Sequence, residues 1–329
     1  MAPDMGAEPS VKPARRAMSS ADQAPAPAPA VRAGSPAAWA AAVRPRTLGV
    51  ALSPVAVGAA FGYARTGHFD GLAALLVLAA ALLMQIVTNL QNDVGYTLRG
   101  GERSGTRTGL PRATAQGWLG ARQVRLAIVV AALAATGVGV ALVAYRGWPV
   151  LAIGSASLLA ALAYMGGPRP IAYTPFGELT VFVFFGLIAV NGSDWVLSGS
   201  VGAASVVASA ALGSLAAAAL ALNNHRDLAH DRAAGRRTFA VSRGAAASMR
   251  LYTGLLLAPF ALLLPLAWAA GPALLLPLGL LPTAWRLRRD FVRCPPGMAY
   301  NRLLLRSFRL HSAFALLLAA AALLGRVGA

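Results

Sequence analysis

The chain has 329 residues, 57% of them hydrophobic, and a formal net charge of +18 at pH 7. So large a hydrophobic share, gathered in long runs, excludes an ordinary soluble domain. The positive charge suggests nucleic-acid binding at first, but the arginines fall in alternate loops, which is the charge bias of a membrane protein. The single cysteine, Cys294, excludes disulfides within the chain and cysteine metal clusters.

Residues 1–36 are rich in Pro and Ala and carry scattered charges. Such a segment cannot bury enough apolar surface to order itself, so we expect a disordered cytoplasmic tail. Residues 37–329 are predicted to form one transmembrane domain. Trp39 and the residues up to Val43 favour a short interfacial helix near its start, because aromatic and Arg residues are enriched at that depth.

Nine apolar runs follow, each about 17 to 22 residues long, which is what a helix needs to cross the hydrocarbon core. They cover residues 47–64, 71–92, 124–145, 148–165, 177–196, 201–222, 251–269, 271–287 and 308–325. The first and eighth runs contain proline, which membrane helices tolerate because neighbouring helices satisfy the freed backbone groups. The expected fold class is an all-α membrane protein with about nine transmembrane helices.

Most arginines lie in three loops, at residues 97–125, 223–250 and 286–309. The loops on the opposite side hold only Arg65 and Arg146, with Arg326 near the C-terminus. By the positive-inside rule, the N-terminus and the three arginine-rich loops lie in the cytoplasm. The excess of Ala and of Arg over Lys suggests a bacterial genome rich in GC, so we expect an integral protein of the bacterial cytoplasmic (inner) membrane.

Two polar segments interrupt the apolar pattern, each at the cytoplasmic end of a predicted span. The first runs from Asn89 to Asp93, and the second, residues 223–231, repeats its Asn-x-x-x-Asp spacing with Asn223 and Asp227. Residues four apart share one face of a helix, so each segment presents an amide and an acid together, and Asp231 extends the second stripe. Ionisable residues at a membrane boundary cost free energy, which makes these segments functional candidates.

The residue types in these segments suit a diphosphate held through a metal ion. Carboxylate and amide oxygens are hard ligands that suit Mg²⁺, which proteins commonly hold together with substrate phosphates. Guanidinium groups bind phosphate bidentately and stay charged. The nearby candidates are Arg107, Arg112, Arg226 and Arg236. The competing interpretation is a set of ordinary interfacial ion pairs, which is common for one acid but less so for two matched clusters.

The two segments resemble the UbiA superfamily of membrane aromatic prenyltransferases, most closely the members that act on 1,4-dihydroxy-2-naphthoate. The similarity covers about residues 38–325, and residues 223–241 (NNHRDLAHDRAAGRRTFAV) match a motif almost position by position. Further matching segments are Arg44 to Leu48, Asn89 to Asp93, Arg107 to Gly109 followed by Arg112, Gly167 to Pro170, Tyr173, and Gly177 with Glu178.

The resemblance implies nine helices around a lipid-open cavity and Mg²⁺-dependent ionisation of a polyprenyl diphosphate. An aromatic acceptor then attacks the allylic cation, and the naphthoate ring loses its carboxylate. Asp93, Asp227 and Asp231 are expected to be catalytic and, with Glu102, to bind Mg²⁺. The expected substrate contacts are Asn89, Asn92, Arg107, Arg112, Arg169, Tyr173, Asn223, Asn224, Arg226 and Arg236. Besides these substrates and membrane lipid, neither nucleic acid nor an obligate protein partner is expected.

The sequence also departs from the family pattern. Tyr96 stands where a second Asp is usual, Thr106 replaces another acid, and Glu178 replaces a common Asp. The first site could therefore hold one Mg²⁺ firmly and a second poorly, or Tyr96 could bond the diphosphate. The residues are also compatible with a different acceptor such as 4-hydroxybenzoate or another phenol, with a relative that lacks activity, and with a membrane transporter.

Two polar residues lie near the other membrane face, away from the predicted chemistry. Asp194 is interpreted as a surface residue. Asn191 is expected to form a hydrogen bond between helices, because polar side chains within spans find partners on neighbouring helices.

Overall fold

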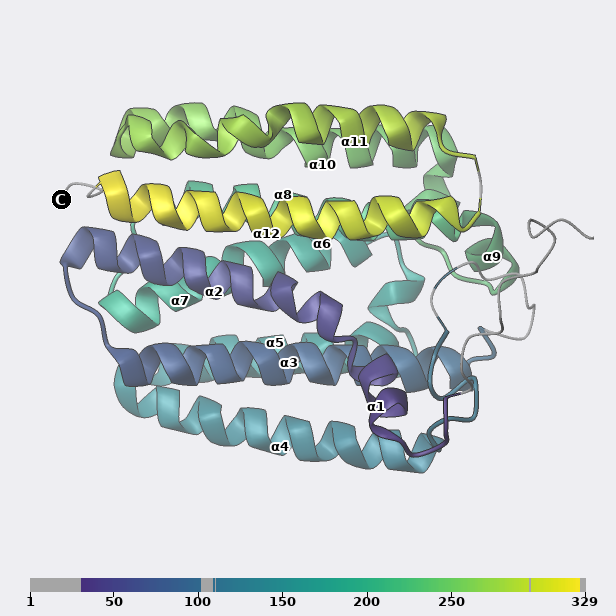
Figure 1. Ribbon diagram of the computed structural model, residues 1–329. Helices are drawn as coiled ribbons and strands as arrows, with labels where there is room; N and C mark the ends of the chain where they lie inside the picture. The colour runs from purple at the N-terminus through teal and green to yellow at the C-terminus, as the bar shows by residue number, and fades with distance from the viewer. Residues whose placement is uncertain (1–30, 102–108, 110, 296, 326–329) are drawn as a thin grey trace, which may run out of the picture.

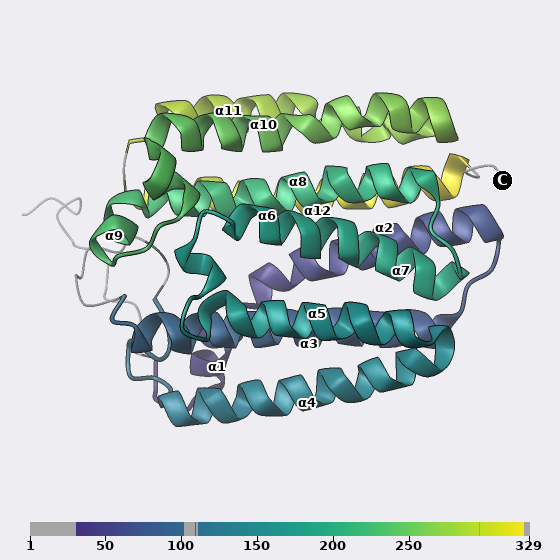
Figure 2. The ribbon, with the colours of Figure 1, turned by 180° about the vertical axis from the view of Figure 1, so that it is seen from behind.

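A computed structural model describes residues 31–101, 109, 111–295 and 297–325 of the chain. Within these residues the chain passes nine times along a helical bundle (Figures 1 and 2). The elements are α1 (Pro36–Val43), α2 (Pro45–Thr66), α3 (Gly71–Leu98), α4 (Ala121–Arg146), α5 (Trp148–Met165), η1 (Ile171–Tyr173), α6 (Gly177–Phe182), η2 (Val183–Ile188), α7 (Ala189–Ser198), α8 (Ala203–Arg226), α9 (Leu228–Ala233), α10 (Phe239–Ala270), η3 (Pro272–Leu280), α11 (Leu281–Arg293) and α12 (Ala299–Gly325).

The prediction of an all-α membrane protein is confirmed. In the described part of the chain, eight passes are single helical stretches long and apolar enough to cross a membrane. The remaining predicted span, residues 271–287, is a 3-10 helix, η3, joined to the α-helix α11. Pro272, Pro277 and Pro282 lie in this pass, and because proline removes a backbone donor and clashes with the preceding turn, a regular α-helix is interrupted there.

The helices form layers between two outer edges. Figure 1 shows α10 and α11 along one edge and α4 along the opposite edge, with α2, α8 and α12 between them. Among the eight long apolar helices, α8 is the most deeply buried, with 78% of its most apolar stretch inside the protein. It packs against α10, α12, α6 and η2. Its run of small residues allows this, because Ala, Gly and Ser let neighbouring backbones approach closely.

The pass formed by α6, η2 and α7 departs from regular α-helix where it packs against α8. Residues 183–188 form a π-helical turn, and Gly186 lies directly against Gly213 of α8. A Cβ atom added at Gly186 would lie 2.5 Å from the Gly213 Cα atom, so only glycine fits this crossing. The wider π turn alters the direction of the side chains that follow it, and such turns are frequent at functional sites.

Both polar segments lie at the same end of the bundle. Helices α3 and α8 reach this end with their C-terminal residues, and α1 and α9 lie there as well (Figures 1 and 2). We call it the motif end; the far end carries the C-terminus of α12. Short helix α1 begins at Ser35, whose hydroxyl accepts a hydrogen bond from the Ala38 N–H at 3.2 Å. The short helix expected around Trp39 is therefore present.

At the far end the interpretation of Asp194 as a surface residue is wrong. Asp194 is fully buried, and its carboxylate accepts hydrogen bonds from Arg65 at 2.9 Å, from Ser205 at 2.6 Å and from the Gly202 N–H at 3.1 Å. Arg65 belongs to α2, and Gly202 and Ser205 belong to the start of α8, so Asp194 joins its own helix α7 to both. The expected helix-to-helix bond of Asn191 is present, because its amide donates to Ser209 at 3.1 Å.

Candidate active site

The first polar segment continues α3 without a break. The Asn89 amide donates to the Val43 carbonyl at 2.7 Å and to the Thr47 hydroxyl at 2.9 Å, while its own oxygen accepts from Gln85 at 3.1 Å. Asn89 therefore attaches α3 to the junction between α1 and α2. At that junction Arg44 has φ of 56°, a left-handed conformation that is unusual for a residue other than glycine.

Asp93 lies one turn further along α3 and is fully buried. Its carboxylate accepts the backbone N–H groups of Ala113 at 2.9 Å and of Thr114 at 2.8 Å, and also the Thr114 hydroxyl. These bonds fix residues 113–114 of the first arginine-rich loop onto the end of α3. The negative charge of Asp93 is thus stabilised by neutral donors.

The second polar segment ends α8 instead of continuing it. Asp227 separates α8 from α9, and the Arg226 guanidinium reaches both of its oxygens at 2.7 Å. Arg226 also donates to the Asn223 side chain at 2.9 Å and to Asn301 of α12 at 2.7 Å. The predicted stripe of Asn223 and Asp227 is therefore present, with Arg226 between its two members.

Asp231 on α9 forms a second buried ion pair. Its Oδ1 atom accepts from the Arg236 guanidinium at 2.6 Å, and Arg236 also donates to the Ala172 carbonyl at 3.0 Å. Burial raises the pKa of the Asp231 carboxyl, while Arg236 opposes that rise. The Oδ2 atom of Asp231 is buried and has no hydrogen-bond partner in the described part of the chain. It is one carboxylate oxygen that remains available to a ligand.

Tyr96 connects the two segments. Its hydroxyl lies 2.5 Å from the Nε2 atom of His230 on α9, and its ring lies beneath the guanidinium groups of Arg112 and Arg236. Arg112 is held by the Asn92 carbonyl at 2.7 Å. Because the Tyr96 hydroxyl bonds His230, a bond from it to a diphosphate would have to replace that contact.

The predicted residues around the 166–178 loop have different surroundings. The Asn224 amide donates to Glu178 at 2.9 Å, and both residues are buried. The Tyr173 hydroxyl is buried without a hydrogen-bond partner among the described residues, and burial raises its pKa, opposed by Arg236. Arg169 is exposed. The Asn224 amide therefore links α8 to α6 through a hydrogen bond, and the Tyr173 ring lies against the Arg236 guanidinium.

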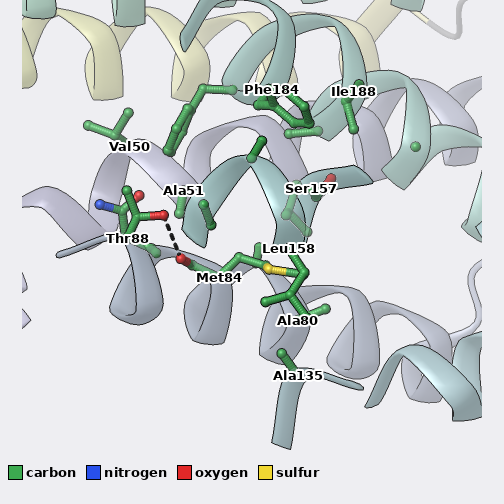
Figure 3. Close-up of a pocket in the computed structure, with 18 of the residues that line it drawn as sticks. Val50, Ala51, Ala80, Met84, Thr88, Ala135, Ser157, Leu158, Phe184 and Ile188 are labelled. Atoms are coloured by element: carbon green, nitrogen blue, oxygen red, sulfur yellow. Dashed lines mark hydrogen bonds between the residues drawn. The ribbon is translucent and has the colours of Figure 1, made fainter. Parts of the chain in front are cut away.

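A large cavity of about 440 Å³ opens beside the motif end and extends between the helices. Figure 3 shows its apolar wall, where Met84, Leu158, Phe184 and Ile188 surround the space and Thr88 bonds the Met84 carbonyl at 2.9 Å. The lining at the motif end is polar and consists of Arg44, Thr47, Asn89, Asn92 and Asn223. The cavity thus combines a long apolar space with one polar end, and both polar segments contribute to that end.

The predicted metal ligands do not form one cluster in the described part of the chain. Among the described residues, no three His, Cys, Asp or Glu side chains form a group that could hold a metal ion. The reason is local: Asp93 is held by a backbone turn, Asp227 by Arg226 and Asp231 by Arg236. Glu102 and Arg107, and the substituted Thr106, lie outside the residues that the structure describes.

Sequence reasoning missed several contacts that build the site. Asn301, His230 and Thr114 each bond a predicted residue, and Thr47 supports Asn89. Asn301 belongs to α12, 75 residues from its partner Arg226, so no local pattern pointed to it. Arg44 and Thr47 lie in the matched segment at residues 44–48, but the match predicted no role for either side chain.

This bundle, with two Asn-x-x-x-Asp segments at the polar end of one apolar cavity, matches a known family over residues 51–313, which is described as the UbiA prenyltransferase family. The chain belongs to the UbiA prenyltransferase family. The resemblance noted in the sequence is therefore confirmed, and membership favours an enzyme over a transporter. The eight long apolar helices and the family together indicate an integral membrane protein.

Individual relatives agree with this assignment. The 1,4-dihydroxy-2-naphthoate octaprenyltransferase of Escherichia coli is 34% identical over 226 residues, which is 67% of this chain and 73% of that protein. The protein of the same name from Haemophilus influenzae is 33% identical over 248 residues, 72% of this chain and 78% of that protein. A solved UbiA homologue from Archaeoglobus fulgidus, bound to GPP and Mg²⁺, aligns with a TM-score of 0.64 and 17% identity over 87% of this chain and 99% of its own. That alignment establishes the shared fold.

Proposed function

We propose that this UbiA-type protein transfers a polyprenyl group from a polyprenyl diphosphate to 1,4-dihydroxy-2-naphthoate, with loss of the carboxylate, to give a demethylmenaquinol. The observation that carries the proposal is the cavity whose long apolar wall ends at the Asn89, Asn92 and Asn223 amides. An apolar chain with an anionic head group matches that division of polarity. The relatives from E. coli and H. influenzae, named for this acceptor, support the choice of ring.

The reaction needs an electron-rich ring and a departing diphosphate. The allylic C–O bond breaks and its electron pair leaves with the diphosphate, while a ring carbon supplies the pair for the new C–C bond. The carboxylate then leaves as CO₂ and returns its electron pair to the ring. The apolar wall of the cavity would keep water away from the allylic cation, which water would otherwise capture.

Buried cationic groups at the motif end would bind the diphosphate. Arg226 and Arg236 are ion-paired with Asp227 and Asp231, and each would exchange its carboxylate partner for a phosphate when the donor binds. Arg112 and Arg236 both contact the Tyr96 ring. Hydrogen bonds from guanidinium groups strengthen as negative charge develops on the leaving oxygen, which lowers the barrier to ionisation.

Mg²⁺ suits the carboxylate chemistry of this end of the bundle. Asp231, whose Oδ2 atom is buried without a partner in the described residues, would hold it with Asp227, while the Asp93 oxygens are taken by residues 113–114. The ion, when bound, neutralises charge on the diphosphate. Its presence with a prenyl diphosphate in the Archaeoglobus fulgidus homologue supports the same requirement here. We further propose that the motif end faces the cytoplasm of a bacterium, because the arginine-rich loops lie there.

The test is an assay in membranes with Mg²⁺, a polyprenyl diphosphate and 1,4-dihydroxy-2-naphthoate, next to an Asp227→Ala variant. We expect a prenylated, decarboxylated product that disappears in the variant and on chelation of the metal. Product from 4-hydroxybenzoate but not from the naphthoate would move the protein to another acceptor. Absence of product from both rings would contradict prenyl transfer.

A further inference from the structure

Tyr96 follows the first polar segment in α3 and contacts His230 of the second. It is 1% exposed, its hydroxyl lies 2.5 Å from His230, and the two rings are nearly parallel with centroids 6.1 Å apart. Tyr96 and His230 are 134 residues apart in sequence. A phenol in this place therefore joins the end of α3 to α9 without adding a formal charge.

Two cationic groups lie over the Tyr96 ring. The Cζ atom of Arg112 is 4.1 Å from the ring centroid, and that of Arg236 is 5.5 Å from it. The face of an aromatic ring attracts cations, and the attraction is strongest where both groups are removed from water. Two guanidinium groups in a buried site repel each other, so the ring offsets part of the cost of holding them together.

The ring is a different kind of partner from a carboxylate. Arg236 already pairs with the Asp231 carboxylate, and the ring attracts both guanidinium groups without adding a further negative charge. Each guanidinium carries five N–H donors. In Arg236, the Ala172 carbonyl and the Asp231 carboxylate accept from only some of these donors. The arrangement therefore keeps positive charge and donors together at the motif end, where an anion can use them.

Gly101 also restricts the position of the Tyr96 ring. A Cβ atom added there would lie 2.4 Å from the Cε1 atom of Tyr96, and the Gly101 N–H bonds the Tyr96 carbonyl at 3.1 Å. No larger residue fits without moving the ring. The turn after α3 thus requires glycine at residue 101 for a steric reason.

We propose that Tyr96 is a positioning residue that holds Arg112 and Arg236 together as a paired cationic site for the diphosphate of the prenyl donor. The inference rests on the proposed function and adds to it the group that organises the anion site. It predicts that the flat ring, more than the hydroxyl, sets the affinity for diphosphate.

The experiment measures binding of inorganic pyrophosphate, with Mg²⁺ present, to the purified full chain in detergent. Tyr96→Met removes the ring and keeps the side-chain bulk, while Tyr96→Phe keeps the ring and removes only the hydroxyl. We expect Tyr96→Met to weaken pyrophosphate binding about tenfold and Tyr96→Phe to change it by less than about threefold. Tyr252→Met is the matched control, because Tyr252 is equally buried but packs against Phe291 of α11.

Steady-state kinetics supply a second readout. Tyr96→Met should raise KM for the prenyl diphosphate and leave KM for the aromatic acceptor unchanged, a split that general loss of structure would not give. If Tyr96→Met does not fold, Gly101→Ala displaces the ring while leaving every functional group, and Gly137→Ala, which has open space, is its control. Gly101→Ala should then weaken pyrophosphate binding by a similar factor.

Different outcomes would contradict the role of the Tyr96 ring and the diphosphate site. Wild-type affinity in Tyr96→Met, or an equal loss in Tyr96→Phe and Tyr96→Met, would overturn the role of the ring while leaving the diphosphate site intact. A wild-type chain that binds no pyrophosphate would instead overturn the diphosphate site itself, and this inference with it.

Discussion

The two polar segments share the spacing Asn-x-x-x-Asp but differ in what holds their acids. Asp93 lies within a continuous helix and accepts two backbone N–H groups and a hydroxyl from residues 113–114. Asp227 lies where α8 ends and pairs with the guanidinium next to it in sequence. One acid is therefore held by neutral donors, and the other by a cation.

This difference suggests separate roles for the two segments. Backbone donors cannot leave Asp93 without unfolding the turn at residues 113–114, so Asp93 mainly fixes the segment that carries Arg112. A guanidinium can exchange one anion for another with little change in geometry, so Arg226 can release Asp227 when a phosphate arrives. The second segment is thus the adaptable half of the site.

The largest expected effect is loss of activity on removing the charge of Asp227. Asp227→Asn keeps the shape of the side chain but leaves the buried Arg226 without its ionic partner, and we expect kcat/KM to fall by roughly a hundredfold or more. Activity in membranes is the measurement. Asp290→Asn is the control, because Asp290 pairs with Arg306 in a partly exposed position and should have little effect. Near-wild-type activity of Asp227→Asn would contradict the assignment.

An intermediate effect, mainly on stability, is expected at Asp93. Asp93→Ala leaves two backbone N–H groups unsatisfied and should lower the free energy of unfolding by about 2 to 3 kcal/mol. Thr114→Val removes only the hydroxyl donor and should cost about 1 kcal/mol. Thermal unfolding in detergent would compare the two variants. If Asp93→Ala kept full stability and lost all activity, Asp93 would be a ligand and not an anchor.

The smallest expected effect concerns Asn301, the contact that α12 adds to the second segment. Asn301→Leu removes the 2.7 Å bond to Arg226 and should reduce kcat/KM about three- to tenfold, because one hydrogen bond to a charged group is lost. The exposed neighbour Arg302, changed to Gln, serves as the control. Equal losses in both variants would show that α12 acts through surface charge, and the proposed support of Arg226 would be wrong.

Local patterns predicted much of the bundle. The bounds of the passes agree with the apolar runs to within a few residues for most spans, as for α5 at residues 148–165, because hydropathy is a sum over neighbouring residues. The proline-rich pass at 271–287 has the predicted position but not a continuous α-helix, since its first half is a 3-10 helix. The two polar segments were also recognisable, because helical spacing alone places Asn89 with Asp93 and Asn223 with Asp227.

The sequence by itself thus determined the membrane class, the order of the passes and the two segments that carry the chemistry. Only the tertiary structure decided the partners: residues 113–114 for Asp93, Asn301 for Arg226, and His230 for Tyr96. It also buried Asp194, which looked like a surface residue. The physical reason is that hydropathy and helical periodicity are properties of contiguous residues, whereas a hydrogen bond or a cation over a ring joins segments that only packing brings together.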